Sequence, residues 1–569
     1  MDLKIIRRES PSVALGAALH PVLQRVYAAR GLKSADELNL ALERLLPVGS
    51  LPGVEAAAEL LRACRDGLVL IIGDYDADGA TSTALIVRAL RAWGFSQVDF
   101  LVPNRFEFGY GLSPEIVAIA ARQSPRLIVT VDNGISSEAG VAAARALGIR
   151  VLITDHHLPG HVLPAADVIV NPNLKDSPFG SRALAGVGVA FYVMAALHRR
   201  LEAAGELPPG APTVARYLDL VALGTVADVV PLDLNNRILV AQGLARIRAR
   251  RAVPGILALL ALAKREISDL IATDLGFGVA PRLNAAGRLT DMSVGIRCLL
   301  SDSPEEAATL ASDLDTLNLQ RRQIEQEMQE QALSAVKRLR DPASAIQRSG
   351  VCLYDPEWHQ GVVGLVAGRV KERLRRPVIA FANADATELR GSARSVPGVH
   401  IRDVLDAIAT RYPELIRKFG GHAMAAGLTL ERSRLDQFAR AFDEEVARWL
   451  ERCGSPDAIE TDGELSTPEL TLATAEALRA AGPWGSGFPE PLFDGTFELR
   501  NARLVGGRHL KVQIGAIEGR GGFDAIAFNY LEPGREGALP TGRRQIIYRL
   551  SANEYQGTRR LQLMIDQLL

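Results

Sequence analysis

Residues 68–90, LVLIIGDYDADGATSTALIVRAL, contain the clearest indication of the fold. An apolar run leads into three aspartates at alternate positions, Asp74, Asp76 and Asp78, and an alanine-rich segment follows Gly79. We expect a strand, a turn and a helix in direct succession. Three carboxylates at this spacing in one turn call for a cation.

The same rhythm continues beyond this stretch. Apolar, β-rich runs alternate with alanine-rich helical stretches such as residues 136–148. This alternation predicts βαβ units and a mostly parallel sheet that is buried on both faces. The predicted strands are residues 68–73, 98–103, 126–132, 150–155 and 166–172.

The whole chain is predicted to be a multidomain α/β protein. Residues 318–341 contain no glycine or proline and predict a long connecting helix, with an ordinary surface helix of the first domain as the alternative. Alternating strands near the C-terminal end predict a small antiparallel barrel or sandwich. The expected parts are a helical segment at 1–50, an α/β domain at 51–235, a helical connector at 236–345, a second α/β domain at 346–454 and a β domain at 455–569.

Composition indicates which class of protein this is, but it does not identify a binding partner. Lys and Arg total 65 against 66 for Asp and Glu, so bulk charge neither requires nor excludes nucleic acid. We find no secretory signal and no apolar run of membrane-spanning length. The four cysteines are far apart and form no CxxC pair, which disfavours a disulfide framework or a thiolate zinc site. We therefore expect a cytoplasmic protein without a membrane partner.

A calcium loop is one interpretation of the aspartate turn. An EF-hand loop needs a glutamate at its twelfth position, where counting from Asp74 gives Leu85. An EF-hand loop is also entered from a helix, whereas this one follows a predicted strand. Both facts disfavour calcium.

A catalytic metal site is the better interpretation, because further polar residues follow the other strands. Asp132 ends one strand, Asp155, His156 and His157 end another, and Asp228 closes residues 218–231 after a predicted glycine turn. Ligands gather beyond the carboxyl ends of parallel strands. Carboxylates with one or two imidazoles suffice for a pair of ions that activate a water against a phosphate ester. The alternative is that these residues only cap helix N-termini.

Asp155-His156-His157 is the DHH signature. Together with GDYDADG, VDNG and GTVAD it resembles the DHH phosphoesterase superfamily, and further motifs resemble the RecJ family of single-strand-specific 5′ to 3′ DNA exonucleases within it. Those motifs are PNRFEFGYGL at 103–112, PRLNAAGR at 281–288, WHQGVVGLVAGR at 358–369, GSARS at 391–395, FGGHAMAAG at 419–427 and PWGSGFPEPLF at 483–493. The resemblance implies a DHH catalytic domain at 51–235, a DHH-associated substrate-binding domain at 346–454 and an OB-like domain at 455–569.

The resemblance also implies a metal site for two divalent ions, Mn²⁺ or Mg²⁺. Its implied ligands are Asp74, Asp76, Asp78, Asp132, His156 and Asp228. Asp76 and Asp78 would bind separate ions and Asp132 would bridge them. His156 and Asp228 would complete one coordination sphere.

Two residues have other implied roles. His157 looks like the group that contacts the scissile phosphate, so it is predicted to be catalytic together with Asp132. Some superfamily members carry a histidine where this chain has Ile72. In this chain Asp74 would then complete the coordination sphere to which that histidine belongs, or support the sphere while a water molecule completes it.

A nuclease for single strands needs phosphate clamps and stacking surfaces. The predicted DNA-binding residues are Arg105, Tyr110, Arg282, Asn284, Arg288, Arg390, Ser392, Arg394, Gly420, Gly421 and His422. The resemblance implies that these groups lie in the second domain, facing the metal site across a cleft. Any one arginine is alternatively a surface residue or an ion-pair partner. Phe106, Phe108, Tyr110 and Trp484 would either stack on bases or pack a loop.

The predicted function is a metal-dependent exonuclease that hydrolyses single-stranded DNA from the 5′ end by a two-metal mechanism, in recombination and repair. Polarity and DNA preference come from the resemblance alone, as do the expected partners, single-strand-binding protein and repair helicases. One alternative is a DHH phosphodiesterase of short RNA or cyclic dinucleotides. Another is a non-catalytic single-strand-binding replication subunit. The OB-like domain would either bind the strand, with Arg508, His509 and Lys511 beside its glycine turn, or only close a clamp.

Overall fold

The structure is a computed structural model that describes residues 4–16, 18–103, 111–160, 162–339, 348–453, 458–515, 522–531, 539–555 and 558–569. Packing divides the chain into two compact units. One unit consists of Ile6–Asp315 with Glu460–Leu569, and the other of Thr316–Ile459 with the first five residues. No helix among the described residues is long and apolar enough to cross a membrane.

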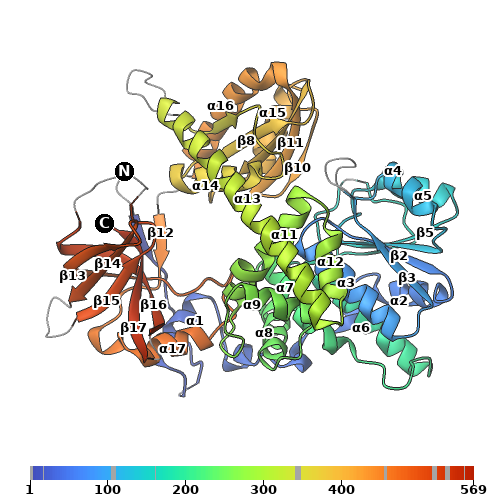
Figure 1. Cartoon of the computed structure of the whole chain (residues 1–569), viewed down its shortest axis with the longest axis horizontal. Coiled ribbons are helices and arrows are strands. Elements are labelled where there is room, and N and C mark those ends of the chain that lie inside the picture. The colour runs from blue at the N-terminus through green and yellow to red at the C-terminus, as the bar shows by residue number, and fades with distance from the viewer. Residues whose placement is uncertain are drawn as a thin grey trace. The chain divides into compact units, whose positions relative to one another are not determined.

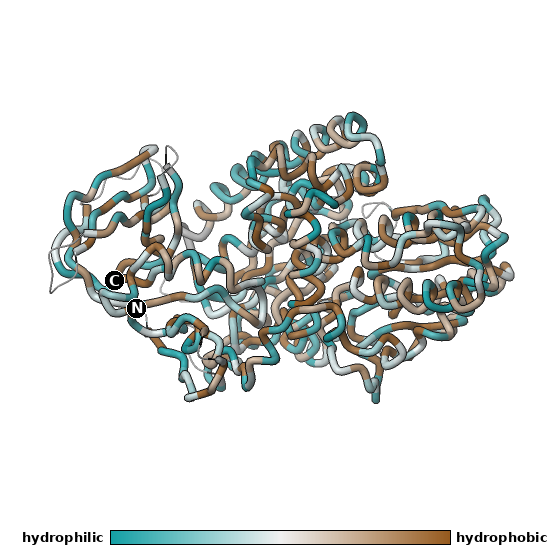
Figure 2. The backbone as a smooth tube through the Cα atoms, turned by 90° about the horizontal axis from the view of Figure 1, so that it is seen from below, coloured by the Kyte–Doolittle hydropathy of each residue, from teal (hydrophilic) through white to brown (hydrophobic). Residues whose placement is uncertain are grey.

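A five-stranded parallel sheet forms the centre of the first unit, as predicted. Its order is β3-β2-β4-β5-β6, and every pair of neighbours is parallel. The strands are β2 (Leu68–Ile72), β3 (Gln97–Leu101), β4 (Leu127–Val131), β5 (Arg150–Thr154) and β6 (Val168–Val170). The apolar strands are mostly brown in Figure 2, which agrees with a sheet buried on both faces.

Helices cover both faces of this sheet. In Figure 1, α4 (Pro114–Ala121) and α5 (Glu138–Ala146) lie on one face, and α2 (Val54–Ala63), α3 (Ala77–Ala92) and α6 (Gly186–Ala203) lie on the other. Because α3 starts directly after β2, its N-terminus lies at the carboxyl edge of the sheet. The aspartate turn is therefore at the edge where ligands bind in parallel sheets.

More helices pack against α3, or against the helices that contact it. They are α7 (Leu218–Ala227), α8 (Leu234–Arg248), α9 (Pro254–Leu262), α10 (Ala272–Asp274), the π-helical turn η5 (Leu275–Val279), α11 (Ala280–Leu289) and α12 (Ser293–Leu300). The predicted glycine turn before Asp228 is wrong. Gly224 lies inside α7, and Asp228 is the C-cap of that helix. A Cβ atom on Gly224 would overlap Thr81 of α3, so this glycine permits close helix packing.

The long helix α13 (Pro304–Leu339) begins earlier than the predicted residue 318. Its first residue is a proline, which suits the first position of a helix. Beyond it, the second unit contains one mixed sheet of order β10-β11-β9-β8-β7, in which only β7 and β8 are parallel. Its elements are β7 (Val351–Tyr354), α14 (Val363–Leu374), β8 (Val378–Asn383), β9 (Glu388–Arg394), α15 (Ile401–Arg411), β10 (Lys418–Gly421), β11 (Ala425–Glu431) and α16 (Leu435–Cys453).

The C-terminal strands form a closed barrel of order β13-β14-β15-β17-β16. They are β13 (Phe493–Val505), β14 (His509–Gly515), β15 (Gly522–Ala527), β16 (Gly542–Tyr555) and β17 (Thr558–Leu568). The predicted barrel is confirmed, although β15 and β17 pair in parallel rather than antiparallel. The remaining α-helices and strands of the described residues are β1 (Lys4–Arg7), α1 (Pro21–Ala29), β12 (Ala458–Thr461) and α17 (Leu472–Ala480).

Candidate metal centre and strand-binding surface

The aspartate turn is shaped by hydrogen bonds to its own backbone. The Asp76 carboxylate is the N-cap of α3 and accepts hydrogen bonds from the backbone N–H groups of Asp78, at 2.9 Å, and Gly79, at 3.0 Å. A Cβ atom on Gly79 would lie 2.7 Å from the backbone nitrogen of Asp74. Only glycine therefore lets the helix start this close to the strand.

The N-terminus of α6 holds the carboxylate of Asp78. Its two oxygens accept hydrogen bonds from the backbone N–H groups of Gly186, at 2.6 Å, and Val187, at 2.9 Å. Free N–H groups at a helix N-terminus favour an anion. Asp78 is thus fixed in one orientation from two helices, since its own backbone belongs to α3.

Asp132 adopts a backbone conformation that is unusual for a residue other than glycine. Its φ is 61°, in the left-handed region, directly after β4. Its backbone N–H still donates to the carbonyl of Thr154 at 3.0 Å, so the strand pairing continues up to this residue. A Cβ atom on Gly186 would lie 2.7 Å from the Cβ atom of Asp132. The α6 N-terminus therefore packs directly against both Asp78 and Asp132.

Asp155 orients the two histidines that follow it. One of its oxygens accepts hydrogen bonds from the backbone N–H groups of His156 and His157, and lies 2.7 Å from His157 Nδ1. Burial alone would lower the pKa of His157, but the hydrogen bond and charge of Asp155 outweigh it and raise this pKa to about 9. Burial likewise opposes the effect of His157 on Asp155, whose pKa nevertheless falls to about 2. This pair favours a protonated imidazole beside the acid cluster.

His156 joins the acids that come from different elements. Its Nε2 atom lies 3.0 Å from Asp132 Oδ1 and 3.5 Å from Asp228 Oδ2. Three groups of three side chains could each hold an ion. Each residue of a group offers one ligand atom, and the three atoms lie within 4.8 Å of one another. The groups are Asp74 with Asp76 and Asp132, Asp78 with His156 and Asp228, and Asp132 with His156 and His157. Because Asp132 and His156 each belong to two groups, the predicted metal ligands form one continuous cluster.

The electrostatics of this cluster fit divalent cations. Burial, followed by the charge of Asp76, raises the pKa of Asp78 to about 7. Burial and the charges of Asp78 and Asp76 also raise the pKa of Asp132 and of Asp228 well above the usual range. Crowded buried carboxylates disfavour the ionised state unless positive charge compensates them. Carboxylate oxygens and imidazoles are suitable ligands for Mn²⁺, and carboxylates for Mg²⁺.

The PRLNAAGR segment packs against the aspartate turn. It does not lie in the second unit, where it was predicted to lie. Asn284 accepts a hydrogen bond from the backbone N–H of Ala77 at 2.7 Å. A Cβ atom on Gly287 would overlap the backbone oxygen of Tyr75. Asn284, Arg282 and Arg288 all lie on α11 in the unit that holds the metal cluster, so the implied location of these three is wrong.

Arg282 is buried and has partners within its own unit. Its Nε donates to Asp315 at 2.8 Å, and a second nitrogen donates to the carbonyl of Gly278. A guanidinium engaged in this way joins α11 to α13. The prediction that Arg282 clamps a phosphate is therefore not supported by its surroundings.

The second unit offers a different kind of surface, on β9, β11 and β10. Arg390, Ser392 and Arg394 alternate along β9 and so lie on one face of the sheet. Arg394 donates to Ser392 Oγ at 3.0 Å and Arg390 to Gln360 at 3.2 Å. A Cβ atom on Gly364 of α14 would lie 2.8 Å from Arg394 Nη2. Gly364, the second glycine of the WHQGVVG segment, thus lets α14 approach Arg394 of β9.

Small residues continue this surface across the sheet. Ser392 pairs with Gly427 of β11, which pairs with Gly420 of β10. A Cβ atom on Gly420 or Gly427 would meet nothing within 4 Å. His422 is exposed just past β10, and Gly421 has a φ of 140°. Six of the predicted DNA-binding positions, Arg390, Ser392, Arg394, Gly420, Gly421 and His422, therefore lie on or beside β9 and β10. We call the face formed by Arg390, Ser392, Arg394, Gly420 and Gly427 the β9–β11 surface.

Five further residues named in the predictions have other outcomes. Arg105 and Tyr110, like Phe106 and Phe108, lie outside the described residues. Trp484 is buried, donates from Nε1 to the carbonyl of Leu478 at 2.9 Å and stacks on Phe488 at 5.2 Å. Its role is therefore packing of a loop and not base stacking.

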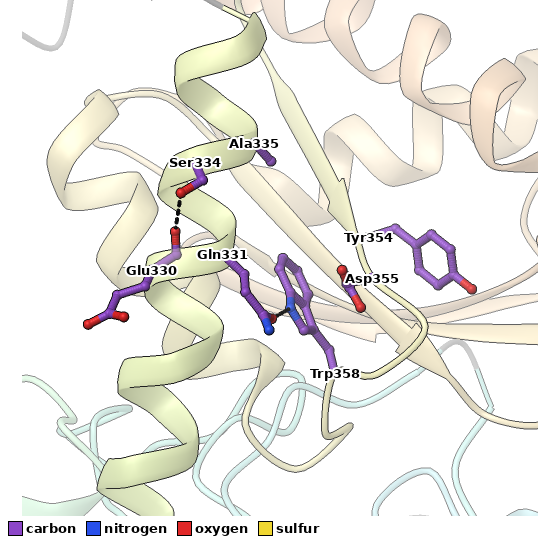
Figure 3. Close-up of a pocket in the computed structure, with 7 residues that line it drawn as sticks. All are labelled: Glu330, Gln331, Ser334, Ala335, Tyr354, Asp355 and Trp358. Atoms are coloured by element: carbon purple, nitrogen blue, oxygen red, sulfur yellow. Dashed lines mark hydrogen bonds between the residues drawn. The ribbon is translucent and has the colours of Figure 1, made fainter.

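A cavity of about 430 Å³ lies between the end of α13 and the segment after β7 (Figure 3). Trp358 Nε1 donates to Gln331 Oε1 at 2.7 Å across it. Its lining carries the carboxyl side chains of Glu330 and Asp355, and none of the described residues that line it is cationic. These residues do not suit a phosphate, so we assign no strand contact to this cavity.

Comparison with known proteins agrees with the resemblance in the motifs. The model of the DHH family, N-terminal domain, matches residues 68–225, that of the DHHA1 domain residues 347–448, and that of the RecJ OB domain residues 461–567. A curated protein of Escherichia coli (strain K12), named single-stranded-DNA-specific exonuclease RecJ, is 53% identical over 577 residues, which cover 100% of this chain and 99% of that protein. The chain belongs to the RecJ family.

RecJ structures share its architecture. The crystal structure of Thermus thermophilus RecJ in complex with Mn²⁺ is 31% identical, with a TM-score of 0.80, and covers 100% of this chain and 79% of that one. The same RecJ in complex with Mg²⁺ is 28% identical, with a TM-score of 0.76, covering 99% and 78%. The multidomain α/β fold with an OB-like barrel is therefore that of RecJ.

Several groups that support this candidate metal centre were not predicted from the sequence. The backbone N–H groups of Gly186 and Val187 have no signal in the sequence beyond the glycines of the segment LAGVGVAF, residues 184–191. Asn171 and Asn173 donate to the carbonyls of His157, at 2.9 Å, and His156, at 2.6 Å. Asparagines at the carboxyl end of β6 are the signal that would have suggested them.

Proposed function

We propose that this chain is a metal-dependent exonuclease that hydrolyses single-stranded DNA from the 5′ end. The observation that carries the proposal is its full-length relation, at 53% identity, to a protein named single-stranded-DNA-specific exonuclease. The buried cluster of acids and imidazoles supplies suitable chemistry. Thermus thermophilus RecJ structures contain Mn²⁺ or Mg²⁺, and these ions suit the same ligand types here.

The metal ligands in this proposal fall into two sets. Asp76, assisted by Asp74, would hold one ion, and Asp78 with His156 and Asp228 would hold the other. Asp132 would bridge them, in keeping with its grouping with Asp74 and Asp76 on one side and with His156 on the other. Two bound ions supply the charge that activates a water and stabilises the transition state of phosphodiester hydrolysis.

The chain's own residues prepare this reaction. The N–H groups of Gly186 and Val187 fix both oxygens of Asp78, so its carboxylate needs no reorientation when substrate arrives. Asp155 holds His157 and favours its protonated form. A protonated imidazole is a suitable donor to an oxygen of the scissile phosphate, and we assign His157 that role.

The β9–β11 surface would bind the strand. Arg390 and Arg394 supply planar donors suited to phosphate oxygens, and Ser392 supplies a hydroxyl between them. Gly420 and Gly427 leave the sheet face open, which lets a sugar-phosphate backbone approach the chain closely. We assign the 5′ polarity, a role in recombination and repair, and contacts with single-strand-binding protein or repair helicases to this chain only as part of the proposal.

One incubation series tests the function. Purified protein is mixed with a 3′-labelled single-stranded DNA oligonucleotide, its duplex or a labelled RNA dinucleotide, each with Mn²⁺, Mg²⁺ or a chelator. Metal-dependent loss from the 5′ end of the single strand alone supports the proposal. Cleavage confined to the dinucleotide moves the function to short-oligonucleotide turnover, and absence of cleavage in every mixture favours a binding subunit.

A further inference from the structure

Val229, the residue directly after the metal-ligand candidate Asp228, combines two unfavourable features. Its φ is 61°, in the left-handed region, where a β-branched side chain is a genuine outlier. Its side chain is also apolar, and the residue is 67% exposed. A glycine or asparagine would adopt this backbone with less strain.

Packing within the described chain does not compensate this strain, because most of the residue faces solvent. Strained residues persist where the surrounding structure imposes them, and they gather at ligand sites. The backbone here is imposed by the end of α7, where Asp228 N–H donates to the Gly224 carbonyl at 2.9 Å. The valine side chain, in contrast, is not needed for that turn. We therefore infer that the group that contacts the Val229 side chain lies outside this chain.

A second exposed apolar residue belongs to a segment that packs on the same helix end. Phe277 is 71% exposed and lies in the π-helical turn η5, an element that is frequent at functional sites. A Cβ atom on the neighbouring Gly276 would lie 3.3 Å from Val226 Cγ1, in the last turn of α7. The turn that carries Phe277 thus contacts the helix whose C-cap is Asp228.

Single exposed apolar residues are common on protein surfaces and need no explanation by themselves. Leu147, for example, is 58% exposed, but it precedes β5 and so lies toward the amino edge of the sheet, away from the metal cluster. Val229 differs because the Cα atoms of consecutive residues are about 3.8 Å apart, which puts it beside a metal-ligand candidate. A nucleotide whose phosphate occupies the metal centre has its sugar and base within reach of such a residue.

We propose that Val229 and Phe277 form an apolar surface that receives the base of the nucleotide next to the scissile phosphodiester. Phe277 stacks on the base, and Val229 contacts it from the side of the metal centre. Stacking on an aromatic ring accepts every base, which suits an enzyme that must degrade any sequence. This inference rests on the proposed exonuclease function and adds a base-binding element to the same site.

Abasic substrates test the inference directly. Two 3′-labelled single strands are compared, identical except that the nucleotide at the attacked end either carries a base or has tetrahydrofuran in its place. The ratio of kcat/KM for the two strands is measured for the wild type, Val229→Gly and Phe277→Ala, and thermal melting is recorded for each protein. Leu147→Ala controls for loss of an exposed apolar side chain, and Arg250→Gly, at a φ of 54°, controls for relief of backbone strain.

The wild type is expected to prefer the base-bearing strand by about tenfold, the effect of one stacking contact. Val229→Gly and Phe277→Ala reduce this preference to about twofold or less, while both controls retain it. Val229→Gly also melts at the same or a higher temperature, because glycine relieves the strain.

Three results would overturn the inference. The wild type shows no preference, or both variants retain the wild-type ratio, or they lose activity equally on the two strands, as a purely structural role or a covering protein partner predicts. In each of these results the wild type still degrades single-stranded DNA, so the proposed function stands while the base contact fails. A wild type that degrades neither strand contradicts both.

Discussion

Glycines at the metal centre and glycines on the β9–β11 surface occupy opposite surroundings. Cβ atoms on Gly79 and Gly186 would lie 2.7 Å from atoms of Asp74 and Asp132. Cβ atoms on Gly420 and Gly427 would meet nothing within 4 Å. The first pair makes room for the protein's own carboxylates, whereas the second pair leaves a sheet face bare. One region therefore fixes charge, and the other leaves open the face that we propose for the strand.

Asp132→Ala tests the charged region most severely. Loss of the proposed bridging carboxylate should reduce hydrolysis of single-stranded DNA on the order of 10³-fold or more, as for other residues that act as part of a unit. Binding of the strand, measured by fluorescence anisotropy, should remain close to that of the wild type because the β9–β11 surface is unchanged. Turnover retained at saturating Mn²⁺ would remove the two-metal scheme.

Gly186→Ala and Gly420→Ala compare one substitution in both regions. At Gly186 the methyl group would lie 2.7 Å from Asp132 Cβ and displace the N–H group that holds Asp78, so kcat should fall by about 10²-fold. At Gly420 the same methyl group has space and should leave kcat and melting temperature unchanged. Equal kinetic effects of the two substitutions would contradict the contrast between the regions.

Arg394→Ala tests the ligand-admitting region alone. Removal of one proposed phosphate contact should weaken strand binding and reduce the slope of log affinity against log salt by about one. The value of kcat at saturating DNA should stay near that of the wild type. Arg417→Ala is the matched control, because Arg417 donates to Glu431 and is an exposed ion-pair partner. An unchanged salt slope in Arg394→Ala would remove this arginine from the strand-binding surface.

Asn284→Ala should have the smallest effect. It removes the acceptor for the Ala77 N–H and should destabilise the fold by about 1 kcal/mol. The apparent Mn²⁺ affinity in activity titrations should fall severalfold, while strand affinity in chelator should not change. The reverse pattern would restore the original prediction that Asn284 contacts DNA.

The sheet and most of its acids were predictable because their signals are local. Apolar runs gave the strands, and the rule for the carboxyl ends of parallel strands brought Asp76, Asp132 and His156 to one edge. The position of Asp228 on a helix was not predictable, since Gly224 suggests a turn until the packing of α7 on Thr81 is known.

Backbone groups explain most of what else was missed. A carboxylate such as Asp78 can be recognised in a sequence, whereas the N–H groups of Gly186 and Val187 that hold it depend on a contact between residues 108 positions apart. Arg282 shows the converse difficulty, since its DNA contact stays a prediction that its surroundings do not support. Its motif resembled a phosphate clamp, but the partner Asp315 engages its guanidinium.

The central claim is that one cluster of acids holds two ions on either side of Asp132. The most direct measurement is an anomalous difference map from a crystal grown with Mn²⁺. The account predicts two peaks about 3.5–4 Å apart, one beside Asp76 and the other beside Asp78, His156 and Asp228, with the Asp132 carboxylate between them. A single peak, or two peaks that do not share Asp132, would contradict it.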